Sequence, residues 1–109
     1  MKPIPRKLLI HTVTHGYSLS KTAWGVESGS SRTISRVRIE PSDKIIKSKD
    51  NTEQQLNAVL FYDCLNSSPN GVTFARDDTI TFGGEVYRVE QVTPLYDEST
   101  LHHYELGLV

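Results

Sequence analysis

Three segments in the last third of the chain, residues 78–82, 85–96 and 101–109, alternate apolar and polar positions. Successive side chains of a β-strand point to opposite faces, so this alternation predicts three half-buried strands. Gly83-Gly84 separates the first two and supplies the pair of positive-φ residues that a two-residue hairpin needs. The residues predicted to share faces are Ile80 with Phe82, Tyr87 with Val89, and Tyr104 with Leu106 and Leu108. We therefore predict a β-meander over this region.

The same pattern continues upstream. Residues 7–14, 33–41 and 56–65 read as three further strands, with Leu9, His11 and Val13 on one face of the first. Within 33–41, Val37 and Ile39 are expected to face one way, and Ile34, Arg36, Arg38 and Glu40 the other. The spacing of Val86, Val89 and Val92 breaks a period of two and predicts a β-bulge near Glu90-Gln91. The expected fold is all-β: a small single-domain barrel or sandwich of about six short strands over residues 1–109.

Two stretches lack this alternation and are predicted to be long, flexible loop insertions. Residues 15–32 contain three glycines and five serines, and residues 42–56 are polar and charged with Ile45-Ile46 as their apolar pair. Glycine disfavours strands, and long irregular segments in a small domain are often functional. The second stretch is also compatible with a partly helical excursion.

Size and composition favour a single soluble domain. The chain has 109 residues, a mean hydropathy of −0.38 and one cysteine, Cys64. A lone thiol cannot form an internal disulfide, and no apolar run reaches the ~20 residues that a membrane span requires. The first residues lack the apolar core of a signal peptide. We expect synthesis in the cytoplasm and no membrane partner.

Charge is divided between the two halves of the sequence. Residues 1–49 carry ten Lys/Arg against three Asp/Glu, a net +7, and residues 50–109 carry two against ten, a net −8. Basic and acidic strands could lie side by side and neutralise each other. Alternatively, the molecule could have a basic and an acidic pole, which would suit head-to-tail contact between copies or one face toward a polyanion.

The sequence offers little support for catalysis. His11 and His15 would lie roughly 13 Å apart on a strand, because each residue advances the strand by ~3.3 Å, and His102 and His103 should face opposite ways. Cys64 ends an apolar stretch, where a thiol is usually inert. Asp77-Asp78 is typical of a solvated turn. We predict no enzyme activity, no cofactor and no metal. A small metal-dependent enzyme that uses the histidines is the third of three hypotheses for the function.

A run of basic residues is the remaining candidate for a binding surface. It comprises Arg32, Arg36, Arg38, Lys44, Lys47 and Lys49. Such groups bind phosphates without sequence preference, so the run could face DNA or another subunit, or could be a solvated surface. Trp24, within the Gly/Ser-rich stretch, could fasten that stretch to the barrel or anchor an interface.

Several blocks of the sequence together resemble one family. They are His11-Thr12-Val13-Thr14, Trp24-Gly25, residues 37–42 (VRIEPS), residues 58–63 (AVLFYD), Leu95-Tyr96-Asp97 and residues 101–109 (LHHYELGLV). These blocks resemble the minor capsid proteins of tailed phages and prophages of Gram-positive bacteria. Two of these blocks, VRIEPS and LHHYELGLV, are the most specific parts of the resemblance.

That resemblance implies a virion protein of the neck, similar to head-completion or stopper-type connectors. It implies an oligomeric ring of copies below the portal that helps to retain packaged DNA and to join the tail. The implied partners are other copies, the portal or adaptor, tail proteins and DNA. The alternative hypothesis is a small cytosolic β-barrel that binds nucleic acid or acts as an adaptor.

Overall fold

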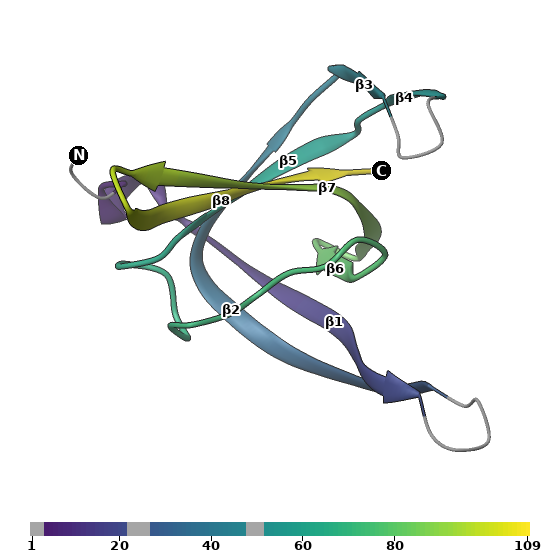
Figure 1. Cartoon of the computed structure of the whole chain (residues 1–109), viewed down its shortest axis with the longest axis horizontal. Coiled ribbons are helices and arrows are strands. Elements are labelled where there is room, and N and C mark those ends of the chain that lie inside the picture. Colours follow the sequence, from purple (N-terminus) through teal and green to yellow (C-terminus); the bar gives the residue numbers. More distant parts are fainter. Residues whose placement is uncertain (1–3, 22–26, 48–51) are drawn as a thin grey trace.

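The computed structural model describes residues 4–21, 27–47 and 52–109, with Arg6 and residues 18–21 and 27–29 described by their backbone alone. In these ranges the chain forms eight strands, one short 3-10 turn (η1, Arg6–Leu8) and no α-helix (Figure 1). The strands are β1 (His11–Lys21), β2 (Glu27–Pro41), β3 (Ile45–Lys47), β4 (Glu53–Gln55), β5 (Ala58–Asp63), β6 (Thr79–Phe82), β7 (Glu85–Asp97) and β8 (Thr100–Leu108). The predicted all-β class is confirmed.

Six strands form a closed antiparallel barrel in the order β1-β2-β5-β8-β7-β6, with β6 pairing back onto β1. The last three strands, β6, β7 and β8, form the predicted meander, and β8 lies between β5 and β7. The remaining two strands, β3 and β4, pair only with each other as a short ribbon. The segment 64–78 connects β5 to β6 and runs along the barrel between them (Figure 1). Closure removes most of the unpaired strand edges that promote aggregation.

The core fills the barrel with apolar side chains, most of them aliphatic, contributed by all six strands. Its buried members are Val13, Ile34, Val37, Ile39, Ala58, Leu60, Tyr62, Val72, Ile80, Val89, Leu106 and Leu108. The predicted inward faces of the last strands are thereby confirmed for Ile80, Val89, Leu106 and Leu108. Val72 comes from the β5–β6 segment, so that connection is packed as part of the core.

The prediction of a loop over residues 15–32 is wrong. β1 continues to Lys21 and β2 begins at Glu27, so most of this stretch is an antiparallel hairpin with a register shift between Ser18 and Lys21. Only residues 22–26 of it lie outside the described structure. Its small residues face one another in the register Gly16↔Ser31, Tyr17↔Ser30 and Ser18↔Gly29. The ladder is held by backbone hydrogen bonds, which glycine and serine supply as well as any other residue. Composition alone therefore misjudged this segment.

The second predicted loop, residues 42–56, contains the β3–β4 ribbon rather than an irregular excursion. Ile46, one of the apolar pair, is buried, and Leu56 is 2% exposed. The first strand was also misplaced: residues 6–8 form the 3-10 turn, and β1 starts at His11 instead of near Lys7.

Irregular positions explain where alternation held and where it failed. Gly83 and Gly84 have φ values of 59° and 82° and join Phe82 to Glu85, as predicted for the hairpin. The predicted bulge is confirmed, because the β7–β8 register shifts between Val89 and Gln91. A further bulge was missed.

That bulge lies at Arg36, which has a φ of 55° and falls where the β1–β2 register shifts. It turns Ile34 onto the same buried face as Val37 and Ile39, so the predicted outward orientation of Ile34 is wrong. Positive φ is uncommon for a residue with a side chain, and nothing in the local sequence signals it.

Candidate assembly surfaces

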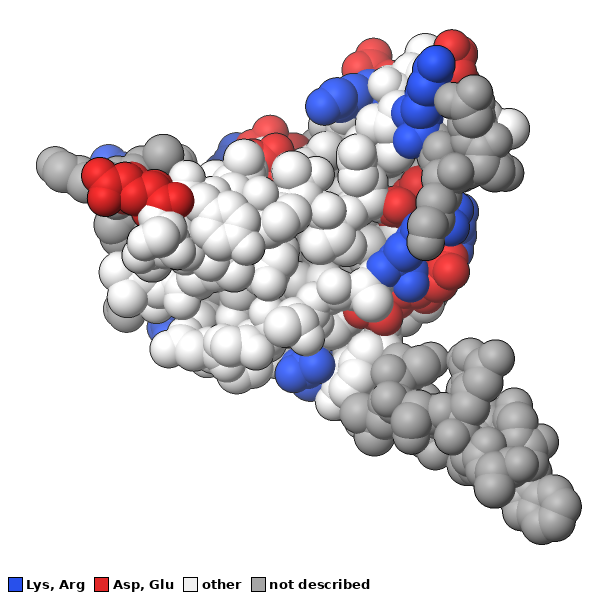
Figure 2. Space-filling view, in the orientation of Figure 1, with Lys and Arg blue, Asp and Glu red and all other residues white. Residues whose placement is uncertain are grey.

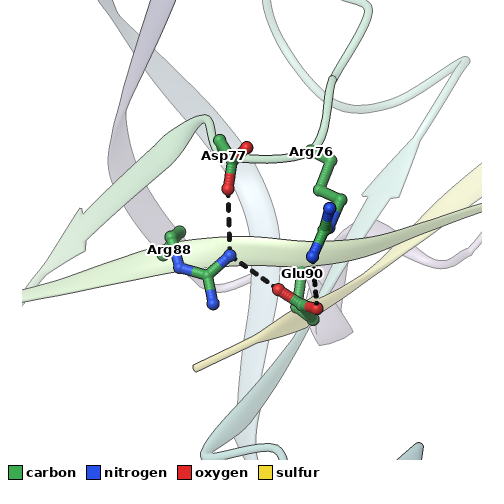
Figure 3. Close-up of polar contacts among 4 residues, drawn as sticks. All are labelled: Arg76, Asp77, Arg88 and Glu90. Carbon is green, nitrogen blue, oxygen red and sulfur yellow. Dashed lines mark hydrogen bonds and ion pairs between the residues drawn. The ribbon is translucent and has the colours of Figure 1, made fainter. Parts of the chain in front are cut away.

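An ion-pair network fastens the β5–β6 segment to β7 (Figure 3). Glu90 lies at the β7 bulge. Its carboxylate accepts hydrogen bonds from Arg76 Nη2 at 3.0 Å and from Arg88 Nη1 at 2.6 Å. Arg88 Nη1 also contacts Asp77 Oδ1 at 3.0 Å. The Glu90 side chain is 1% exposed, whereas both arginine side chains are about 40% exposed. One buried carboxylate is thus held between two cations that remain in contact with water.

Burial raises the pKa of Glu90, but the hydrogen bonds and positive charges of Arg76 and Arg88 together exceed that effect and hold its pKa below the ordinary value. The pKa of Arg88 is raised, chiefly by its hydrogen bond to Glu90. Glu90 and Arg88 are therefore charged at neutral pH. The network links residues 76 and 77 to β7 and so stabilises the position of the β5–β6 segment on the barrel.

A second buried pair joins the two charge-segregated halves of the sequence. His15 is fully buried, and its Nε2 lies 2.8 Å from Asp78 Oδ2. Its Nδ1 has no hydrogen-bond partner among the described residues, and its ring packs at 4.8 Å from that of Phe74. Burial lowers the pKa of His15 in spite of Asp78. Asp78 is 8% exposed, so the prediction of a solvated turn holds for Asp77 and is wrong for Asp78.

The other adjacent histidines also differ from expectation. The β7–β8 register skips His102, which places it in a bulge, and its Nδ1 lies 2.7 Å from Nδ1 of His103. His103 Nε2 lies 3.1 Å from Glu105 Oε2. The two rings therefore touch rather than facing apart. Within the described ranges no group of three or more His, Cys, Asp or Glu is arranged to hold a metal ion.

The predicted basic run is spread over three places. Arg32 lies 4.1 Å above the ring of Tyr17, near the base of the β1–β2 hairpin. Arg36 Nε donates to the Asn66 carbonyl at 3.0 Å, and Arg38 Nε pairs with Glu40 at 2.6 Å on the barrel wall. The arginines are thus engaged within the chain.

The lysines of the run lie apart from the arginines. Lys44 and Lys47 are exposed at the β3–β4 ribbon, where Lys47 pairs in register with Glu53. Lys49 and Trp24 fall outside the described residues. The structure therefore does not gather the predicted residues into one basic surface.

Neither of the two predicted charge arrangements describes the surface completely. Among the described residues, the ion pairs between arginine and carboxylate join groups from the same half of the sequence. Figure 2 shows blue and red side chains mixed at the ribbon and along the right-hand side of the molecule, and red side chains over the β7–β8 turn. Between these charged areas lies a broad white area over β7, β8 and the β5–β6 segment (Figure 2).

We define the uncharged face by residues of these elements, namely Leu65, Tyr96 and Leu101 with the partly buried Cys64, Phe74 and Tyr104. Leu65 and Tyr96 are 66% and 58% exposed. Tyr96 pairs in register with Leu101, Tyr104 packs against Phe74, and Cys64, Leu65 and Leu101 line one hollow of about 550 Å³. The carboxylates of Asp63, Asp97 and Glu98 also line that hollow. Exposed apolar patches of this kind often mark interaction sites.

Burial raises the pKa of the Cys64 thiol, and the charge of Asp63 raises it further. The thiol is therefore protonated at neutral pH and a poor nucleophile. This agrees with the interpretation of Cys64 as an inert residue.

Sequence reasoning missed Glu90, Asp78 and the uncharged face as features. A signal for the first was present, because Arg76 and Arg88 are the two basic residues after position 49 and the predicted bulge turns Glu90 inward. The face could have been found from residues 64–75, which hold no charged residue. The partner of Asp78, by contrast, is 63 positions away and requires the fold.

Comparison with known proteins agrees with the resemblance found in the sequence. A family model described as minor capsid protein matches residues 5–108. No curated protein matches the chain. Among the described residues, no helix is long and apolar enough to cross a membrane. Since the match covers nearly the whole barrel, including the network and the uncharged face, the chain belongs to the minor capsid protein family of phage virion structural proteins.

Proposed function

We propose that this minor capsid protein is a component of the head–tail connector. Copies would form a ring in the neck below the portal, help to retain packaged DNA and join the tail, in a phage or prophage of a Gram-positive host. The observation that carries the proposal is the long β1–β2 hairpin that extends beyond the closed barrel (Figure 1). A rigid barrel with a projecting two-stranded arm suits a protein that holds neighbours in place.

The location can be tested on particles. A fusion at the exposed β6–β7 turn, Gly83-Gly84, would place a label away from the uncharged face. Electron microscopy of labelled virions should show extra density at the neck, repeated around the tail axis. Density on the capsid shell or along the tail tube would refute the connector role while leaving the family assignment intact.

Contact with packaged DNA is proposed for the ribbon rather than for the whole basic run. Lys44 and Lys47 are exposed there, whereas Arg36 and Arg38 already have partners. The variant with Lys44, Lys47 and Lys49 changed to Gln should fold normally and lower the yield of DNA-filled heads. Neutralising the exposed Lys7 on the 3-10 turn is the matched control. A normal yield of full, infectious particles from the triple variant would remove the DNA-facing proposal.

The exposed ribbon lysines also motivate the alternative, a free nucleic-acid-binding module. A filter-binding titration against duplex and single-stranded DNA separates the two proposals. Micromolar binding by the monomer that falls steeply with salt would favour the alternative, since phosphate contacts release counterions. Absence of binding by the monomer is what the connector proposal expects, because many copies would share the contact.

A further inference from the structure

The distal part of the β1–β2 hairpin lacks support from the barrel. Beyond Gly16, β1 pairs with β2 alone, because its contacts with β6 end at the Gly16↔Thr79 pair. β2 pairs with β5 only from Val37, and before that point the described structure gives it one isolated bridge, Ser35↔Ser68. We call residues 17–21 and 27–30 the arm, since Tyr17↔Ser30 is the first pair beyond Gly16. A two-stranded ribbon without a third element is marginally stable in water, so the arm is expected to require a partner.

The arm and the uncharged face both come from parts of the sequence with few charged residues. The sequence has 25 charged residues, and residues 16–31 contain two of them, Lys21 and Glu27, which pair in register and cancel. Residues 64–75 and 91–96 contain none. Two surfaces without net charge can meet without leaving a buried ion unpaired, which would be costly.

The arm and the uncharged face lie on different parts of the molecule. One copy can therefore contact one neighbour through its arm and another neighbour through its uncharged face. The arm projects at the lower right of Figure 1, whereas the β7–β8 turn beside the hollow lies at the left. A contact between different patches at different ends is heterologous, and it closes into a ring when the rotation between copies allows.

The contact is expected to use side chains rather than addition of a strand to β7. Residues 91–97 of β7 pair only with β8 among the described strands, so one edge is open. The backbone N–H and C=O of Arg88 point toward β8 and form hydrogen bonds with Val109. Those of Val89 point to the opposite side, where they form hydrogen bonds with Asp78 and Asp77. If this alternation continues through the bulge at Glu90, the backbone nitrogen of Pro94 points away from β8, toward the open edge. Proline cannot donate a hydrogen bond, so it blunts the open edge.

We propose that the uncharged face binds the arm of a second copy, with Tyr96 and Leu65 as its main contacts. Tyrosine often dominates binding at interfaces because it buries a large area at little entropic cost. The hollow beside Cys64 and Leu101, which Asp63, Asp97 and Glu98 also line, borders the contact. This inference rests on the ring of copies in the proposed function and names the surfaces that form it.

The single cysteine allows a direct test, since Cys64 lies within the uncharged face. The full chain is labelled on Cys64 with a maleimide benzophenone at alkaline pH, as its raised pKa requires, and ¹⁴N and ¹⁵N copies are mixed before irradiation. Mass spectrometry should find crosslinks from one isotopic copy to the arm of the other. The control is the Cys64→Ser, Glu85→Cys variant, whose label sits at the exposed β6–β7 turn. Crosslinks that remain within one copy, or equal capture of the arm from the control position, would overturn the proposal.

Complementary variants provide a second test without a bulky label. The face variant is Leu65→Glu with Tyr96→Glu, both at exposed positions. The arm variant replaces residues 18–29 with Asn-Gly, which closes the hairpin at the Tyr17↔Ser30 pair with a two-residue turn. Circular dichroism checks that both fold.

By light scattering over a concentration series, each variant alone should associate at least tenfold more weakly than the wild type. An equimolar mixture should form a 1:1 dimer and nothing larger, because each partner keeps one intact surface. A wild type that stays monomeric, or variants that associate as it does, would refute the arm contact. A neck location shown by microscopy would survive that result, so the two proposals fail separately.

Discussion

Replacing Glu90 with Gln should show how much the fastening of the β5–β6 segment contributes to stability. The change keeps the shape of the side chain and removes the charge that Arg76 and Arg88 both contact. A hydrogen bond to a charged group contributes about 1.5–3 kcal/mol. Two such bonds are weakened, but both arginines are about 40% exposed and can regain water. We therefore expect a loss of about 2 kcal/mol in the free energy of unfolding at pH 7.

The loss should depend on pH in a defined direction. The folded-state pKa of Glu90 is lowered, so its ionised form stabilises the fold above the pKa of an unfolded glutamate, about 4.3. This contribution disappears as the pH falls through the lower, folded-state pKa. The Gln variant cannot titrate at this position, and the difference between the two proteins should shrink below about pH 4.

Urea denaturation followed by circular dichroism measures both effects. For a slope of about 1–3 kcal/mol/M, the expected loss shifts the midpoint by about 1 M at pH 7. Glu85→Gln, at an exposed position of the same strand, is the matched control and should change stability by less than about 0.5 kcal/mol. A Glu90→Gln effect no larger than that of the control, or one that is the same at pH 7 and pH 3, would refute the reasoning.

Three further substitutions test other parts of the structure. Burial lowers the folded-state pKa of His15, so stability should fall as the pH drops below about 6.5, and His15→Gln should remove that slope in denaturation measured between pH 7 and pH 5. Gly84→Ala, at a φ of 82°, should lower the melting temperature, since left-handed geometry costs a residue with a Cβ about 1–2 kcal/mol. Gly16→Ala should destabilise because its Cβ would collide with Thr79 Oγ1, and adding Thr79→Ala should restore much of the loss. A double variant no more stable than Gly16→Ala alone would contradict this last explanation.

The fold was predictable from sequence wherever local pattern decides the structure. Alternation identified the inward residues Ile80, Leu106 and Leu108, and Gly83-Gly84 identified a hairpin that requires two positive φ values. The bulge at Glu90 followed from a break in the same alternation. Each of these features depends on residues within a few positions of one another.

The failures share a different cause, which is dependence on distant parts of the chain. Residues 15–32 were read as a loop because their glycines and serines lack strand propensity, yet cross-strand pairing holds them in β1 and β2. Strand propensity is strongly context-dependent, so composition could not settle this. The pairing of Asp78 with His15 and the packing of Phe74 against Tyr104 also join residues far apart in the sequence.

The shortest ladders of the barrel have a consequence for its motions. β6 joins its neighbours through three residue pairs with β1 and four with β7, whereas β5 and β8 share six. Local opening of a native protein begins where few interactions must break. The ladders that join β6 to β1 and β7 should therefore open first, so that the barrel transiently becomes an open sheet while the β5–β8 pairing stays intact. Outside the arm, amide exchange in the barrel strands should then be fastest at Thr79–Phe82, and opening there would give water brief access to the His15–Asp78 pair.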